Sequence, residues 1–491
     1  MGKVANQSIQ TTIFSYLGVV IGYFNVLWLY PYALEAAQLG TFRTIQDMAL
    51  LFVPFAQLGL GHGITRFFPK LEQGQSAFLS FSLLLALAGF LVVSLLFWFF
   101  QQSIISLFAV NSPDILPYLG IVLLITFMAL MNSILDAYSR SFLKVAIPTF
   151  FREVFIRLLI GLWVSCFLME WISFDQLMLG LVAIYGIPLV GMLGYLGWLN
   201  VLKLDIRWNN FPPNFRRSFL RFSLITFLAT AASTLIMKID SVMVSSMISL
   251  EANAIYTIAF SMALVIEMPR RAISQVVMPV IADHFSRDEF AEINQIYKQV
   301  SRRQLYICLL LFVGLWANID SIYHFIPNRE IYETGKWVVF LIGLGKLFDV
   351  AFSVNSEILV FSAYYRFNLT ATILMSFSII VLNYLLIPSF GIVGAAMASA
   401  LVMLVFNLWK YFYLKQKLGF VPFDQTTLKI LLIGGFSLII TANLPAMENP
   451  LLAIGIKTTL ILGVYRLAIL LKIYGQEELD WVRKKIKKPG S

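Results

Sequence analysis

Ionisable side chains occur inside long apolar runs of this 491-residue chain, where a buried charge needs a partner or water. Arginine and lysine in such places could hold a diphosphate, because guanidinium matches phosphate oxygens in a rigid bidentate geometry. Buried carboxylates could take up a proton or a metal cation instead. The residues that we predict to line a shared substrate cavity are Arg43, Asp47, Arg157, Lys238, Asp240 and Lys346.

Spacing along the chain sorts these candidates. Arg43 and Asp47 are four residues apart, which places them on one face of a helix, whereas Lys238 and Asp240 are two apart and point to different faces. A local ion pair that neutralises itself is the alternative interpretation for any single pair. With Glu267, the two aspartates Asp47 and Asp240 form our set of candidate ion-coupling residues.

Other chemical signatures are missing from the sequence. His62, His284 and His324 are scattered without metal-ligand spacing, and neither a phosphate-binding glycine loop nor a nucleophile elbow occurs. We therefore expect no catalytic residues, no metal site, no enzyme activity and no cofactor, apart from H⁺ or Na⁺ as a coupling ion.

The amino-acid composition indicates which kind of secondary structure positions these residues. Apolar residues make up 59% and charged residues 13%, with a mean hydropathy of +0.82. A soluble domain carries about 25% charged residues. The apolar runs are also continuous, which is typical of helical spans and not of membrane β-strands. The sequence thus predicts an all-α, polytopic membrane protein.

We expect about fourteen transmembrane helices of roughly 20 or more residues each. They are predicted near 10–31, 40–65, 77–100, 116–137, 147–169, 176–199, 218–247, 254–280, 304–325, 336–360, 367–388, 391–413, 428–445 and 450–471.

The basic residues gather in every second loop, and only the 326–335 loop, with Arg329, breaks this pattern. Loops such as 32–39 and 170–175 contain acidic but no basic residues, whereas 200–217, 281–303 and the C-terminal tail are rich in lysine and arginine. Cytoplasmic loops carry such an excess, so both termini are expected in the cytoplasm. Orientation and attraction to anionic membrane lipids explain the net charge of +10, and no nucleic-acid partner is expected.

Short motifs recur in the two halves of the chain. Asn132-Ser133 and then Ala137–Arg140 close the fourth predicted span, as Asn355-Ser356 and then Ala363–Arg366 close the tenth. Six spans per repeat predict two parallel six-helix lobes. The predicted domains are an N-terminal lobe (1–200), a cytoplasmic linker (201–217), a C-terminal lobe (218–417), and two additional helices with a basic tail (418–491).

Several segments resemble a known family. Lys238–Met243 followed by Asn253–Ala259 is similar to the seventh and eighth spans of bacterial polysaccharide flippases, and Leu386–Ala396 is similar to their eleventh-to-twelfth hairpin. Leu39–Phe42 resembles the opening of the family's second span. On these segments the chain is identified as a member of the multidrug/oligosaccharidyl-lipid/polysaccharide exporter superfamily, most similar to Wzx-type flippases.

The resemblance implies alternating access around a central cavity in the bacterial inner membrane. It also implies flipping of an undecaprenyl-diphosphate-linked oligosaccharide, driven by an ion gradient, for surface polysaccharide synthesis. Partners would be this lipid-linked substrate, membrane lipids, and a polysaccharide polymerase with its chain-length proteins. The related lipid II flippases have arginines lower in the second span, and Leu51–Gly61 contains no basic residue, which argues against lipid II.

Two alternatives stay open. A multidrug/cation antiporter of the same superfamily would prefer an acidic cavity, and the basic residues found here disfavour it. A membrane glycosyltransferase or polysaccharide polymerase would need a sizeable outer loop with catalytic groups, and the predicted outer loops are short.

Overall fold

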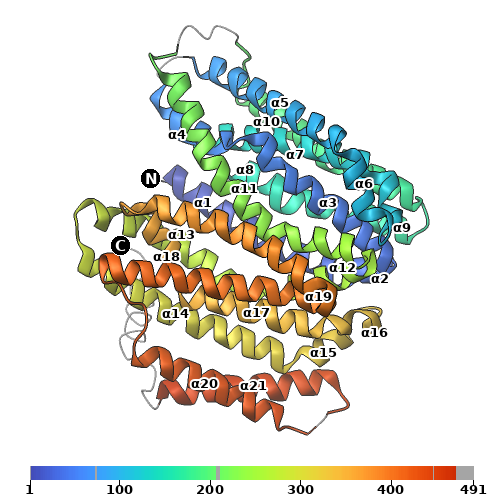
Figure 1. Cartoon of the computed structure of the whole chain (residues 1–491), viewed down its shortest axis with the longest axis vertical. Coiled ribbons are helices and arrows are strands. Elements are labelled where there is room, and N and C mark those ends of the chain that lie inside the picture. The colour runs from blue at the N-terminus through green and yellow to red at the C-terminus, as the bar shows by residue number, and fades with distance from the viewer. Residues whose placement is uncertain (1, 72–73, 206–210, 446, 471–491) are drawn as a thin grey trace. The chain divides into compact units, whose positions relative to one another are not determined.

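The computed structural model describes residues 2–71, 74–205, 211–445 and 447–470, and this part of the chain is helical without any strand (Figure 1). Part of the predicted linker, 206–210, and the end of the predicted basic tail, 471–491, lie outside the described residues. By proximity the chain forms two compact units, one of residues 1–258 and 372–395, the other of 259–371 and 396–491. The lobes expected from the sequence repeat stay a prediction.

The helices of the first half of the chain are α1 (Gly2–Phe24), α2 (Tyr30–Ala33), α3 (Ala36–Gln57), α4 (Leu60–Phe67), α5 (Gln75–Phe99), α6 (Gln101–Ala109), α7 (Leu119–Ser141), α8 (Ala146–Thr149), α9 (Ile156–Leu168), α10 (Phe174–Trp198) and α11 (Phe215–Met247). The remaining helices are α12 (Leu250–Leu264), α13 (Met268–Ser286), α14 (Phe290–Ala317), α15 (Ile319–His324), α16 (Arg329–Tyr332), α17 (Lys336–Ala351), α18 (Asn355–Phe361), α19 (Tyr365–Leu418), α20 (Gln425–Ala442) and α21 (Pro450–Leu470).

Membrane-spanning helices dominate this list. Ten helices are long and apolar enough to cross a membrane, or up to twelve if each of two bent pairs counts as one span. The segment 146–168, in which a π-helical turn (Phe150–Phe155) joins α8 to α9, and the division of α19 at Gly391 account for the other two predicted spans. The protein is therefore a multi-pass, all-helical membrane protein, as predicted.

Gly391 divides α19 into two helices. Its φ of 58° and ψ of −140° lie in a region that is essentially restricted to glycine. The backbone of Gly394 packs directly against Leu386, eight residues earlier, whereas a straight helix would separate them by about 12 Å. The chain thus reverses here, and the predicted hairpin between the eleventh and twelfth spans is confirmed.

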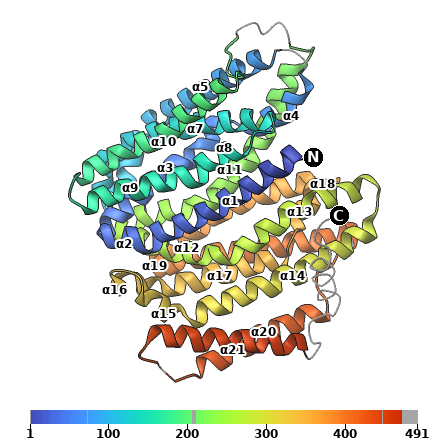
Figure 2. The ribbon, with the colours of Figure 1, turned by 180° about the vertical axis from the view of Figure 1, so that it is seen from behind.

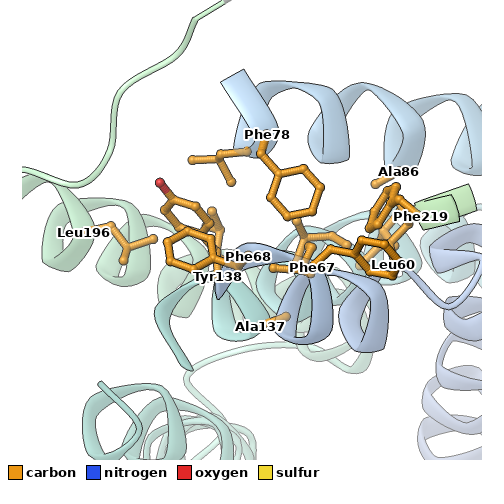
Figure 3. Close-up of a cluster of buried hydrophobic side chains, with 14 of the residues drawn as sticks. Leu60, Phe67, Phe68, Phe78, Ala86, Ala137, Tyr138, Leu196 and Phe219 are labelled. Carbon is orange, nitrogen blue, oxygen red and sulfur yellow. The ribbon is translucent and has the colours of Figure 1, made fainter. Parts of the chain in front are cut away.

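In the first unit, α3 packs against α5, α7 and α11, and α7 packs against α10. Leu58 and Gly59, both with positive φ, bend the chain by 47° between α3 and α4. A side chain at Gly59 would overlap the backbone of Ser223, so glycine is required for α11 to approach this bend. Figure 3 shows the aromatic core beside it, where Phe67, Phe78 and Phe219 pack in edge-to-face contacts.

In the second unit, α14 packs against α13, α17 and α20, and α20 lies beside α21 in both views (Figures 1 and 2). The 3₁₀ turn Val265–Glu267 interrupts the helical run between α12 and α13, and Pro269 in the next turn has no backbone N–H for a helical hydrogen bond. Glu267 therefore lies at a break in a membrane-spanning helix.

Candidate functional site

Ion pairs link the charged residues of the first unit across helices. The Nζ of Lys238 on α11 lies 2.5 Å from Oδ1 of Asp47 on α3. Asp47 is buried, with 6% of its side chain exposed, and Lys238 is 26% exposed. Asp47 thus pairs between helices and not with Arg43, one turn away on its own helix.

Arg43 is the member of this group with unused hydrogen-bonding capacity. Its Nε is buried and has no hydrogen-bond partner within the described part of the chain. Arg43, Asp47 and Lys238 together carry one net positive charge, which is that of Arg43 because Asp47 and Lys238 neutralise each other. An unpaired buried donor is costly, and it is the kind of cost that proteins accept at functional sites.

The geometry of α3 is set by close contacts with α11 and α12. Thr44 and Ser245 share a 2.6 Å hydrogen bond, and Nδ2 of Asn253 donates to the same Thr44 hydroxyl at 2.8 Å. A side chain on Gly40 would overlap the backbone of Leu250, so these helices touch directly. This buried polar contact lies one turn from Asp47 and fixes the register of α3 against α11.

Asp240 has a different environment from Lys238, as the spacing predicted. Its two carboxylate oxygens accept hydrogen bonds from the Tyr256 hydroxyl at 2.7 Å and from Nδ2 of Asn383 at 2.6 Å. The residue is 2% exposed. Arg157 pairs with Glu153, one turn away on its own helical segment, at 3.0 Å, and its Nη1 is buried without a hydrogen-bond partner among the described residues, as Nε of Arg43 is.

The second unit holds a denser network around Glu267. Lys346 Nζ lies 2.6 Å from Oε2 of Glu267, and only 4% of the Lys346 side chain is exposed. Nε of Arg271 lies 3.1 Å from the other carboxylate oxygen, with 56% of the Arg271 side chain exposed. Glu267 is thus held between one buried and one exposed cation.

Arg270 continues this network. Its guanidinium lies 2.7 Å from Asp349 and 3.8 Å from Glu357. The Arg270 side chain is 15% exposed and faces these carboxylates, so it is part of the protein interior and not an anchor at the lipid headgroups. Asn407 of α19 donates to Asp349 at 3.1 Å.

Glu357 and Lys410 are further ionisable residues that were not predicted from the sequence. Lys410 is 7% exposed, and its ammonium donates to Ser356 at 3.0 Å. Both residues are ionisable groups inside predicted spans, so the criterion that selected Lys346 would have found them. Within the described residues no group of three His, Cys, Asp or Glu side chains is arranged to hold a metal ion.

The sequence of the N-terminal half matches a known family. Residues 8–285, more than half of the chain, match the model of the family described as polysaccharide biosynthesis protein. The chain belongs to this family. The resemblance noted in the sequence is confirmed at this level.

Known relatives agree over nearly the whole chain. An uncharacterized membrane protein of Methanocaldococcus jannaschii is 21% identical over 482 residues, which cover 93% of this chain and 94% of the relative. The structure is similar to the lipid II flippase MurJ in an inward closed conformation, with a TM-score of 0.74, 18% identity, and coverage of 94% of this chain and 99% of MurJ.

Other transporters of the superfamily share the fold. An inward-facing multidrug resistance MATE family transporter matches with a TM-score of 0.63 and 13% identity, over 83% of this chain and 94% of the transporter. A superfamily transporter from Pyrococcus furiosus, whose binding pocket is described as having reverse polarity, matches with a TM-score of 0.59 and 15% identity, over 85% and 95% of the two chains. These similarities show that this chain has the fold of MurJ and the MATE transporters.

Proposed function

We propose that the protein is a transporter, and not an enzyme, that flips an undecaprenyl-diphosphate-linked oligosaccharide from the inner to the outer leaflet of the bacterial inner membrane, with both termini in the cytoplasm. Family membership and the fold shared with a lipid II flippase support transport in polysaccharide synthesis. The observation that carries the choice of an anionic substrate is Arg43, a cation beside the neutral Lys238–Asp47 pair, whose buried Nε has no hydrogen-bond partner in the described chain.

The mechanism follows from exchange of ion-pair partners. A diphosphate that binds Arg43 competes with Asp47 for Lys238, and a proton or Na⁺ that neutralises Asp47 lowers the cost of releasing that lysine. Substrate and coupling ion would then favour the same rearrangement, which is the differential affinity that alternating access requires. Asp240 and Glu267 are the other candidate coupling residues, and Lys346 would be released by Glu267 in the same way.

The test begins with a strain that lacks the protein. Lipids are extracted, polyprenyl-diphosphate-linked oligosaccharides are quantified, and the surface glycan is stained. We expect lipid-linked units to accumulate while the glycan disappears from the surface. Unchanged lipid pools together with new sensitivity to cationic drugs would contradict the proposal and favour a drug exporter.

Point variants then test the basic residues. Arg43→Ala, Lys238→Ala and Lys346→Ala are expressed in the deletion strain, with Arg287→Ala as a control because Arg287 is an exposed surface residue paired with Asp283. We expect at least a tenfold loss of surface glycan in Arg43→Ala and none in the control. Normal glycan in all three of these variants would show that these cations do not hold the substrate.

A further inference from the structure

A cavity of about 320 Å³ lies within the first unit, between α3, α7, α10 and the segment 146–168. It is at the lower end of the size range of small-ligand pockets. Its wall includes Asn132 and Ser133, the repeated motif that the proposed function leaves without a role. The charge distribution predicts that this end of α7 faces the cytoplasm.

Local irregularities open the cavity. Pro148 and Pro188 line it, and the π-helical turn Phe150–Phe155 contributes Phe151. Gly191 of α10 makes room for that phenylalanine, because a Cβ there would lie 2.6 Å from the Phe151 ring. Extra π-helical turns of this kind are frequent at functional sites.

Three polar side chains of the wall, Gln57, Asn132 and Ser133, already donate hydrogen bonds within the protein. Nδ2 of Asn132 donates to the carbonyl oxygens of Met128 and Tyr185, both at 3.0 Å. Nε2 of Gln57 donates to Ser133 at 3.0 Å, and the Ser133 hydroxyl donates to a backbone carbonyl.

Acceptor oxygens in the wall, in contrast, have unused hydrogen-bonding capacity. Oδ1 of Asp136 is buried and accepts no hydrogen bond from the part of the chain that the structure describes. The side-chain amides of Gln57 and Asn132 donate hydrogen bonds through their nitrogen atoms, which leaves their oxygen atoms as acceptors. An occupant of this cavity can donate hydrogen bonds to these oxygens and accept them from the guanidinium groups of Arg140 and Arg152, which also line the cavity and are 42% and 52% exposed.

Charge balance selects among such donors. Oδ2 of Asp136 lies 2.7 Å from the Arg152 guanidinium and 3.4 Å from that of Arg140. Because two cations already neutralise this carboxylate, the cavity offers no net negative charge to an ammonium group or a metal ion. A neutral polyhydroxyl group fits this wall better than a cation.

Apolar surface completes the wall, with Phe151, Pro148, Pro188 and Met192 beside the polar groups. A pyranose ring has the matching surface, since its C–H faces are apolar and its hydroxyls point outward as donors. We propose that this cavity binds one sugar ring of the transported oligosaccharide. That the sugar belongs to a transported oligosaccharide rests on the proposed function, whereas the ability of the cavity to bind a sugar ring does not.

Sugar binding can be measured directly by saturation-transfer NMR on the purified full-length protein in detergent. The probes are the methyl glycosides of glucose, galactose and N-acetylglucosamine, with ethanolamine as the amine probe. The variants are Asp136→Asn and Gln57→Leu. In the first, the new amide keeps its oxygen with the two arginines and turns an N–H donor toward the cavity in place of an acceptor. The second removes an acceptor at nearly constant side-chain volume.

Matched controls change the same residue types outside the cavity. Asp175→Asn alters an aspartate at the start of α10 whose partner is Tyr118, and Gln46→Leu alters a buried glutamine of α3 that bonds within its own helix. Thermal midpoints and gel-filtration profiles of all four variants show whether each one folds.

We expect at least one glycoside to receive saturation from the wild type and both controls, and at least fivefold less from Asp136→Asn and Gln57→Leu. No transfer to any glycoside, equal transfer in folded cavity variants, or preferential transfer to ethanolamine would each overturn the inference. Failure of the proposed function can be distinguished from failure of this inference. If the deletion strain had normal pools of lipid-linked oligosaccharide but the purified protein still bound a glycoside through Asp136, the cavity would be a sugar site and the flipping function would be wrong.

Discussion

The two units each contain a lysine–carboxylate pair between helices, and the two pairs differ in their surroundings. The Lys238–Asp47 and Lys346–Glu267 distances are nearly equal, at 2.5 and 2.6 Å. Lys238 is 26% exposed with the partly unsatisfied Arg43 nearby, whereas Lys346 is 4% exposed and its carboxylate has a second partner. The lysine–carboxylate pair of the first unit can therefore exchange partners, whereas the corresponding pair of the second unit is enclosed.

This difference assigns different roles to the two ion pairs. A buried pair is weak evidence for net stabilisation, but loss of one member leaves an isolated buried charge. A pair whose lysine is partly exposed, as Lys238 is at 26%, can be opened by water or by a competing anion at lower cost than a pair whose lysine is enclosed. The Lys238–Asp47 pair of the first unit is thus better suited to reversible contact with the substrate. The Lys346–Glu267 pair of the second unit is better suited to hold its helices together.

The largest effect is expected for Lys346→Met. It leaves the buried Glu267 without its buried lysine, and the ion pair that remains among the described residues is with the exposed Arg271, so the free energy of unfolding should fall by about 3–5 kcal/mol. Unfolding by SDS titration in mixed micelles, followed by tryptophan fluorescence, measures the change. The double variant Glu267→Gln/Lys346→Met should recover most of the loss, because it removes both charges. Equal destabilisation of the single and double variants would contradict a specific pair.

Lys238→Met should cost less, about 1–2 kcal/mol, because Arg43 lies one turn from Asp47 and can neutralise it in place of the lysine. The same titration measures this change. If Lys238→Met destabilised the protein as much as Lys346→Met, the contrast between an exchangeable and an enclosed pair would be lost.

Much of the fold could be predicted from the sequence, because the lipid solvent imposes simple rules. Apolar runs of sufficient length indicated the all-helical, multi-pass architecture, and Gly391 lies where the predicted hairpin reverses. The bend at Leu58–Gly59 was not predicted, because it depends on how closely α11 approaches through Ser223, a contact between distant segments.

The charged sites were only partly predictable. Residue type and burial cost identified Asp47, Lys238, Glu267 and Lys346 as charges that need partners. Helical spacing predicted which side chains share a face, but not which helices lie opposite, so Asp47 with Lys238 and Arg270 with Asp349 could not be paired from the sequence. The cavity beside Asn132 was also missed, because a cavity arises from packing irregularities that no local pattern records.

Arg271→Ala sharpens the comparison within the second unit. Arg271 also pairs with Glu267, but its side chain is 56% exposed, so its removal should change the free energy of unfolding by only about 0–1 kcal/mol. The SDS titration is run beside Lys346→Met. A loss as large as that of Lys346→Met would show that the exposed cation, and not the buried one, holds Glu267.

Arg43→Met should have the smallest effect on stability, with no loss and a gain of up to about 1 kcal/mol, because methionine keeps much of the apolar stem and removes a buried donor that lacks a partner in the described chain. The same substitution should abolish surface glycan in the deletion strain if this guanidinium holds the diphosphate. Stability and transport would then change in opposite directions at one residue, the relation expected where a protein keeps an unsatisfied group for its ligand. A clear loss of stability together with normal glycan would instead make Arg43 a structural residue of the first unit, and the exchange of partners around Lys238 would lose its anionic trigger.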